Sequence, residues 1–114
     1  MKEQAIQQAA QQNPEINETY SSPQVDIYET EHQLVLMADM PGVTAEQLTI
    51  DVEKGLLTLD GWVERHAADG EETVQRHHYR RRFQIGRQFD PQQAAATLEA
   101  GVLTLTLPRL QASL

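Results

Sequence analysis

Two adjacent histidines, His77 and His78, are the residues of this sequence with the most obvious metal-binding chemistry. Imidazole nitrogens are common zinc ligands, but a zinc site needs several ligands around one point. Neighbouring residues of a β-strand point to opposite faces, so these two side chains cannot jointly bind one ion. The sequence also has no cysteine and no His-x-x-x-His spacing. We therefore expect neither a metal ion nor another cofactor.

Catalytic chemistry has little support among the other polar residues. The only serines are Ser21, Ser22 and Ser113, and no glycine-rich phosphate-binding loop is present. Seventeen acids in 114 residues produce acid pairs by chance. The acids that suggest such a pair are Asp60, Glu64, Glu71 and Glu72. Because an enzyme needs a nucleophile, a base and a charge stabiliser in one place, we expect this protein not to be an enzyme.

Positive charge is concentrated in one segment of an acidic protein. Five of the nine basic residues lie between positions 76 and 87 with no acid among them, although the net charge is −8. These five are Arg76, Arg80, Arg81, Arg82 and Arg87. An acidic protein repels nucleic acid, so a basic strand within it favours complementarity inside the chain or between subunits. We expect no nucleic-acid partner.

Length and composition indicate a single domain. A chain of 114 residues with 39% hydrophobic residues can form one modest core. The absence of cysteine fits a reducing compartment. The first residues lack the apolar run of a signal peptide, and no stretch approaches the roughly 18 apolar residues of a membrane span. We expect a cytoplasmic protein with no membrane contact.

The strand patterns begin after a polar N-terminal segment. Residues 1–13 are rich in glutamine and alanine, and residues 14–24 carry the proline, asparagine and serine of a linker. We expect an arm over residues 1–22 that is flexible or a short helix, a domain over 23–109, and a short tail over 110–114.

Short strand patterns with turn signals between them predict an all-β sandwich. The alternation of Leu103, Leu105 and Leu107 with polar residues indicates a strand with one buried face. Turns are predicted at residues 40–43 and 54–55, and a helical turn at 91–95. The expected strands are 25–30, 33–39, 47–53, 56–63, 77–85, 95–99 and 102–107.

Several segments together resemble the α-crystallin domain of the small heat shock proteins (Hsp20 family). The A-x-x-x-x-G-V-L string at residues 96–103 resembles the signature that closes this domain, and four other segments match in the right order. The matching segments are 23–30 (PQVDIYET), 38–43 (ADMPGV), 55–61 (GLLTLDG), 79–85 (YRRRFQI) and 96–108 (ATLEAGVLTLTLP). The resemblance implies an immunoglobulin-like sandwich that dimerises and holds partly unfolded client proteins without ATP.

The resemblance also implies a dimer interface. Arg81 matches the family's interface arginine and is expected to pair with a carboxylate at or near that interface; the simpler interpretation is a stem that covers apolar surface while its head reaches water. The expected interface residues are Thr73, Val74, Tyr79, Arg81 and Phe83. Residues 73–76 are either a strand exchanged between subunits or the start of one long edge strand that runs to residue 85.

A docking groove for clients or tails is the second implied site. The expected lining is Leu48, Ile50, Val52, Ala95 and Thr97. The simpler interpretation is that Leu48, Ile50 and Val52 belong to the inner face of the sandwich. In that case Ala96 and Leu98 fill the role of Ala95 and Thr97.

Two departures from the family pattern affect the expected assembly. The N-terminal arm is short and polar, and Leu110 and Leu114 do not reproduce the family's I-x-I spacing. These features predict a homodimer with weaker or partner-dependent activity, alone or in a hetero-oligomer with a longer family member. The alternative is a CS-like adaptor domain, which has the same architecture, is often monomeric and recognises a defined folded partner.

Overall fold

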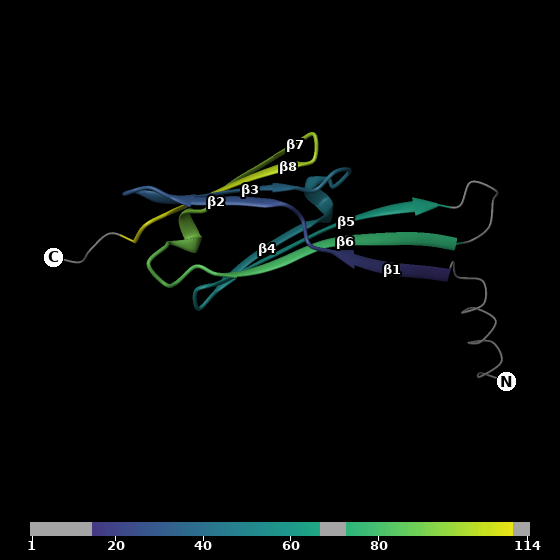
Figure 1. Ribbon diagram of the computed structural model, residues 1–114, viewed down its shortest axis with the longest axis horizontal. Helices are drawn as coiled ribbons and strands as arrows, with labels where there is room; N and C mark the ends of the chain where they lie inside the picture. The colour runs from purple at the N-terminus through teal and green to yellow at the C-terminus, as the bar shows by residue number, and fades with distance from the viewer. Residues whose placement is uncertain (1–14, 67–72, 111–114) are drawn as a thin grey trace.

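The computed structural model describes residues 15–66 and 73–110, which form two four-stranded sheets (Figure 1). The sheets have the strand orders β1-β6-β5-β4 and β2-β3-β8-β7. The strands are β1 (Glu15–Ser21), β2 (Val25–Glu29), β3 (Gln33–Asp39), β4 (Leu48–Glu53), β5 (Leu56–His66), β6 (Thr73–Gln84), β7 (Ala95–Glu99) and β8 (Val102–Pro108). The predicted all-β sandwich is confirmed.

The core lies between the two sheets and follows from strand alternation. Leu103, Leu105 and Leu107 of β8 are at most 1% exposed, and they share one cluster with Leu57 and Leu59 of β5. The residues between these leucines on β8 are half-buried. The predicted alternation on β8 is therefore confirmed. Hydrophobic burial of this kind is the main stabilising contribution to a small domain.

The turn after β3 has the predicted chemistry. Gly42 has a φ of +84°, a conformation that favours glycine, and it follows Pro41, whose ring fixes φ. The amide of Val43 donates to the carbonyl oxygen of Met40 at 3.1 Å, which closes the turn. Two short 3-10 turns, η1 (Ala45–Gln47) and η2 (Pro91–Gln93), join other strands, and η2 lies within the predicted helical turn.

The hairpin between β7 and β8 has a two-residue turn at Ala100 and Gly101. Their φ values are +49° and +76°, and positive φ at both positions is the signature of a type I′ turn. The amide of Met40 donates to the carbonyl oxygen of Gly101 at 2.6 Å. A Cβ atom on Gly101 would lie 2.8 Å from the Cα of Pro41. This turn therefore packs directly against the backbone of the loop that follows β3.

One predicted segment is wrong. The sequence predicts a linker over residues 14–24, but residues 15–21 form β1, which pairs in parallel with β6 from Glu15–Thr73 to Ser21–Tyr79. All seven residues of β1 are exposed. The segment therefore lacks the alternation of apolar and polar residues that predicts a half-buried strand. Residues 1–14 of the predicted arm (1–22) and residues 111–114 of the predicted tail (110–114) lie outside the described residues. The domain boundaries at 22/23 and 109/110 stay predictions.

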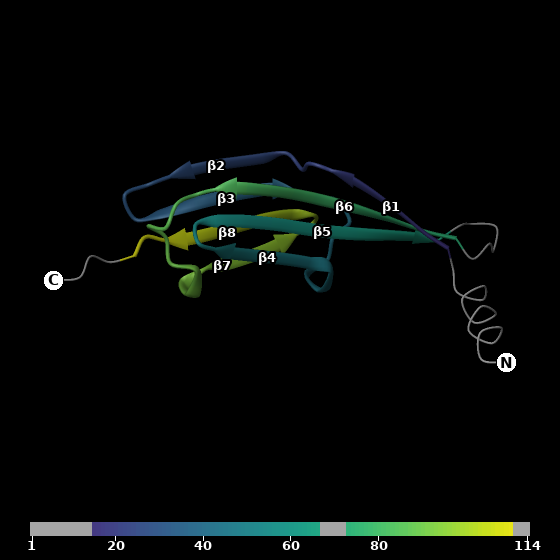
Figure 2. The same cartoon turned by 90° about the horizontal axis from the view of Figure 1, so that it is seen from below.

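β5 and β6 form a long hairpin that reaches beyond the sandwich. β5 continues to His66 instead of ending at residue 63, and residues 73–76 run on into one continuous β6. Figure 2 shows β1 and the ends of β5 and β6 projecting past the second sheet. We call β1, residues 62–66 and residues 73–79 the extension. Among the described residues, no helix has the length and apolar character needed to cross a membrane.

Candidate functional site

Strands β4 and β7 border one open side of the sandwich. Each is the last strand of its own sheet, and Figure 2 shows the two on the same side of the molecule. Leu48, Ile50 and Val52 of β4 are half-buried and pack against the core, while the residues between them are exposed. Within residues 15–66 and 73–110, this side therefore combines two unpaired strand edges with a partly exposed apolar lining, the surface to which an extended peptide can add.

The structure corrects the β7 residues of the predicted groove. Ala96 pairs with Leu105 and Leu98 with Leu103, so Ala96 and Leu98 share the inner face with these buried leucines. Ala95 and Thr97 lie on the opposite, outer face of β7, paired with Thr106 and Thr104. A shift of one residue reverses the face of a strand side chain. Leu98, which is half-buried against the core, therefore belongs to the β4/β7 side in place of Ala95 and Thr97.

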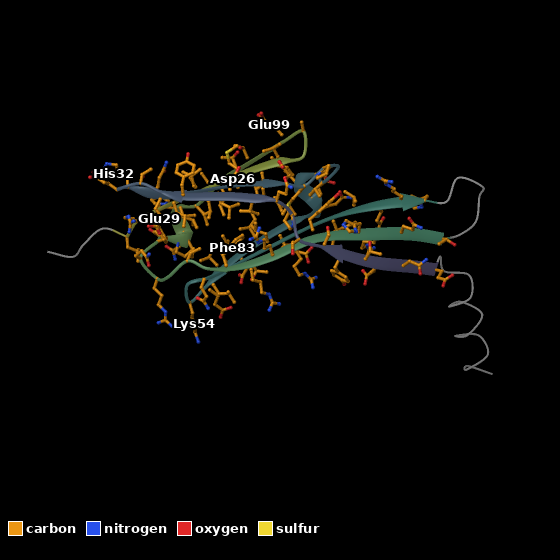
Figure 3. The ribbon with its side chains drawn as sticks, viewed as in Figure 1. Asp26, Glu29, His32, Lys54, Phe83 and Glu99 are labelled. Carbon is orange, nitrogen blue, oxygen red and sulfur yellow. The ribbon has the colours of Figure 1, made fainter. Side chains whose placement is uncertain are left out.

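Strands β2 and β6 border the other open side. Figure 3 labels Asp26 on β2 and Phe83 on β6. A groove of about 390 Å³ is lined by residues from both strands, and it includes Ile27, whose side chain is 41% exposed. β1 pairs with β6 only as far as Tyr79, so the edge of β6 beyond that residue is uncovered within the described part of the chain.

Arg81 lies on this side with its predicted neighbours. Its cross-strand partner is the buried Leu59, and Tyr79 and Phe83 on the same face are half-buried against the core. The Arg81 guanidinium lies 4.8 Å from the centre of the Phe83 ring and donates to the carbonyl oxygen of Pro23 at 3.3 Å. No carboxylate of residues 15–66 or 73–110 forms an ion pair with it. Its predicted carboxylate partner across a dimer interface stays a prediction.

Thr73 and Val74 lie apart from these residues, at the far end of the extension. Val74 is 5% exposed and pairs with the exposed Ile16 of β1. In the single chain, β1 therefore covers the edge of β6 at both predicted residues. Thr73 and Val74 can lie in the predicted dimer interface only if β1 leaves this edge of β6 or pairs with it in another way.

One face of the extension carries a network of charged and aromatic side chains that joins its three strands. Arg76 donates to Glu64 of β5 and, at 3.4 Å, to Glu18 of β1. Arg80 donates to Asp60 through two nitrogens at 2.9 and 2.6 Å. The predicted complementarity of the basic strand within the chain is therefore confirmed for these two arginines. The hydrogen bonds raise the pKa of both guanidinium groups, mainly through Glu64 for Arg76 and Asp60 for Arg80.

His78 is at the centre of this network and is only 8% exposed. Its ring stacks on Tyr20 of β1 with the centroids 4.6 Å apart. Nδ1 lies 3.0 Å from a carboxylate oxygen of Asp60, and Nε2 lies 3.3 Å from one of Glu18. The sequence did not predict this site, because β1 showed no strand signal. Within the described residues, no three histidine or acidic side chains are grouped to hold a metal ion.

Asp60 has a pKa below the ordinary value of 3.8. Burial alone would raise the pKa of this carboxyl, but hydrogen bonds from His78 and Arg80, and their charges, outweigh it. A depressed pKa in the folded state stabilises the protein at pH values above the pKa of the unfolded chain, and this contribution is lost as pH falls through the folded value.

We predict that Asp60→Asn lowers the free energy of unfolding by about 1 kcal/mol near pH 7. The effect is no larger because solvent screens the attraction between the Asp60 carboxylate and its partners. Urea unfolding between pH 7 and pH 2.5 measures the difference from wild type. The difference should persist down to about pH 4 and shrink below it, where the wild-type carboxyl also becomes protonated. Asp51→Asn, at an exposed position of β4, is the matched control. A constant difference at all pH values would contradict the role of the Asp60 charge.

Comparison with known proteins places this architecture in one family. Residues 26–113 match the model of the Hsp20/alpha crystallin family. A probable 15 kDa heat shock protein of Leptospira interrogans is 32% identical over 91 residues, which are 77% of this chain and 70% of that protein. An 18.1 kDa class I heat shock protein of Oryza sativa is 33% identical over 98 residues, 79% of this chain and 60% of that protein.

Solved structures agree with the sequence matches. A small heat-shock protein from Xylella fastidiosa superposes with a TM-score of 0.67 at 26% identity, over 82% of this chain and 91% of that one. The hspA protein of Xanthomonas axonopodis gives a TM-score of 0.65 at 28% identity, over 82% and 98%. With its two-sheet fold, its Gly101 turn and these relatives, the chain belongs to the Hsp20/alpha crystallin family.

Proposed function

We propose that this protein is a chaperone that holds partly unfolded proteins and limits their aggregation without ATP. The observation that supports this function best is the β4/β7 side, where Leu48, Ile50, Val52 and Leu98 lie between two unpaired strand edges. An extended apolar segment of a client can pair with an edge while its side chains contact this lining. Binding of the unfolded client lowers the free concentration of the species that aggregates, by mass action alone.

A homodimer through the β2/β6 side is the second part of the proposal. Its support is the unpaired edge of β6 beyond Tyr79, the exposed Ile27 and the half-buried Phe83, all on one side of the sandwich. Arg81 lies among them with its guanidinium near the surface. Such an arrangement suits a second copy of the chain that supplies both apolar cover and a carboxylate.

The function is tested by heating an aggregation-prone enzyme with the purified protein and following light scattering. We expect suppression of scattering that is the same with and without ATP. Leu98→Asp should raise the amount of protein needed for half protection several-fold, because it places a charge in the apolar lining. Thr97→Asp, one residue away on the outer face, is the matched control.

Circular dichroism and thermal melting establish that both variants are folded. If the wild-type protein leaves aggregation unchanged, the holding function is wrong. If Leu98→Asp protects as well as wild type, clients bind elsewhere on the molecule.

A further inference from the structure

β1 is fastened to the rest of the protein by hydrogen bonds and surface side chains only. None of its residues belongs to the core cluster, and all seven are exposed. Its side chains contact residues of β6: Glu18 binds Arg76 and His78, Tyr20 stacks on His78 and lies under Arg80, and Thr19 and Ser21 both bind His77. A strand held in this way can detach without unfolding the sandwich.

The two histidines that hold β1 differ in the chemistry of their partners. His77 places Nδ1 2.6 Å from the hydroxyl of Thr19 and Nε2 2.8 Å from the hydroxyl of Ser21. A hydroxyl can donate or accept, so both contacts are satisfied whether or not the ring is protonated. His78 instead places both nitrogens against carboxylates, which only accept.

His78 can therefore satisfy both contacts only as the imidazolium. A neutral ring has one N–H, and the nearer acceptor, Asp60 at 3.0 Å, competes for it with Glu18 at 3.3 Å. When Asp60 takes the N–H, the lone pair of Nε2 faces the Glu18 carboxylate. Asp60 remains bound by Arg80, whereas among the described residues Glu18 keeps only the 3.4 Å contact from Arg76.

Among the strands around His78, β1 is the one whose contacts change most when the ring gains or loses its second proton. From β5, Asp60 faces the ring and Trp62 is its cross-strand neighbour; from β6, Arg76 and Arg80 flank it. Arg76 binds Glu64 of β5, and Arg80 binds Asp60 of β5, so the pairing of β5 with β6 keeps its ion pairs in either state. On β1, by contrast, Glu18 and Tyr20 both contact the His78 ring directly, in addition to their contacts with Arg76 and Arg80.

We propose that β1 is a pH-sensitive strap on the edge of β6, held more tightly when His78 is protonated than when it is neutral. The strap covers β6 from Thr73 to Tyr79, and this edge continues directly into the uncovered edge beyond Tyr79. Detachment of β1 lengthens the edge of β6 that is available to a second copy of the chain. This consequence rests on the proposed dimer. Loss of the His78 proton therefore favours the form in which the whole edge of β6 is free to pair with a second copy.

Hydrogen–deuterium exchange of residues 15–21 tests the strap between pH 5.5 and 8, after correction for the intrinsic pH dependence of amide exchange. Protection of β1 should fall about tenfold as pH rises, the ratio that corresponds to one charge-assisted hydrogen bond. Protection of β8, measured in the same samples, should stay constant. Glu18→Gln should abolish the pH dependence, and it changes a side chain outside the core that is 40% exposed. His78→Gln should do the same, whereas His77→Gln should keep the wild-type profile.

Each outcome separates the strap from the proposed dimer. Protection of β1 that does not change with pH, or a pH dependence that survives Glu18→Gln, would overturn the strap. Light scattering of the same samples gives the mass: a monomer at every pH, with the expected exchange profile, leaves the strap standing and rejects the dimer.

Discussion

A Gly101→Ala variant is expected to lose about 2–4 kcal/mol of unfolding free energy relative to the wild-type protein. Two effects add at this position. The φ of +76° is strained for any residue with a Cβ, and that Cβ would lie 2.8 Å from the Cα of Pro41 and 3.0 Å from the carbonyl oxygen of Met40. Both contacts are with backbone atoms, which cannot rotate away as a side chain can. The turn would have to move and lengthen the Met40–Gly101 hydrogen bond.

Ala100→Gly is the matched control, one residue away in the same turn. Its φ of +49° also favours glycine, so the substitution relieves strain while it makes the unfolded chain more flexible. We expect a net change within about 0.5 kcal/mol, since the two effects have similar size. Urea unfolding monitored by circular dichroism measures both variants. Equal stability of Gly101→Ala and wild type would show that this turn does not press against the loop after β3.

An Arg81→Ala variant is expected to convert the proposed dimer into a monomer or an aggregate. If Arg81 pairs with a buried carboxylate of the second copy, removal of the guanidinium leaves that carboxylate uncompensated, at a cost of about 3–5 kcal/mol. Such a loss weakens dimer association by at least two orders of magnitude. Light scattering over a concentration series measures the mass and the dissociation constant.

Arg82→Ala provides the control for charge alone. Arg82 is the next residue on β6, lies on the opposite face and pairs across the strand with Thr58. The Arg82→Ala variant should therefore leave the proposed dimer intact. A wild-type protein that is monomeric, and unaffected by Arg81→Ala, would instead favour the CS-like adaptor that recognises a folded partner.

Local sequence patterns were sufficient for the sandwich. The leucines of β8 alternate with polar residues, and the apolar segment from Leu34 to Ala38 forms the central strand β3, although Met37 on its outer face is 42% exposed. The turn at Pro41 and Gly42 follows from the backbone preferences of these two residues. In each case the residues that specify the structure are adjacent in the chain.

Contacts between distant segments explain what the sequence did not predict. β1 has no apolar face of its own, and its side-chain partners are on β6. The end of β5 is equally polar, yet it stays extended to His66 because it pairs with Val74 and its neighbours. The groove residues on β7 were misplaced for a related reason. Alanine and threonine give little sign of which face is buried, and only pairing with the leucines of β8 decides it.

The parallel pairing of β1 with β6 also sets the order in which the nascent chain can fold. Thr19 and His77, which bind each other, are 58 residues apart. At 5–20 residues per second, a ribosome makes β6 about 3–12 s after β1. During this interval β1 has no β6 to pair with. β1 is therefore the first strand of its sheet to be made, yet it cannot join the sheet until β6, the last of these strands, has been made.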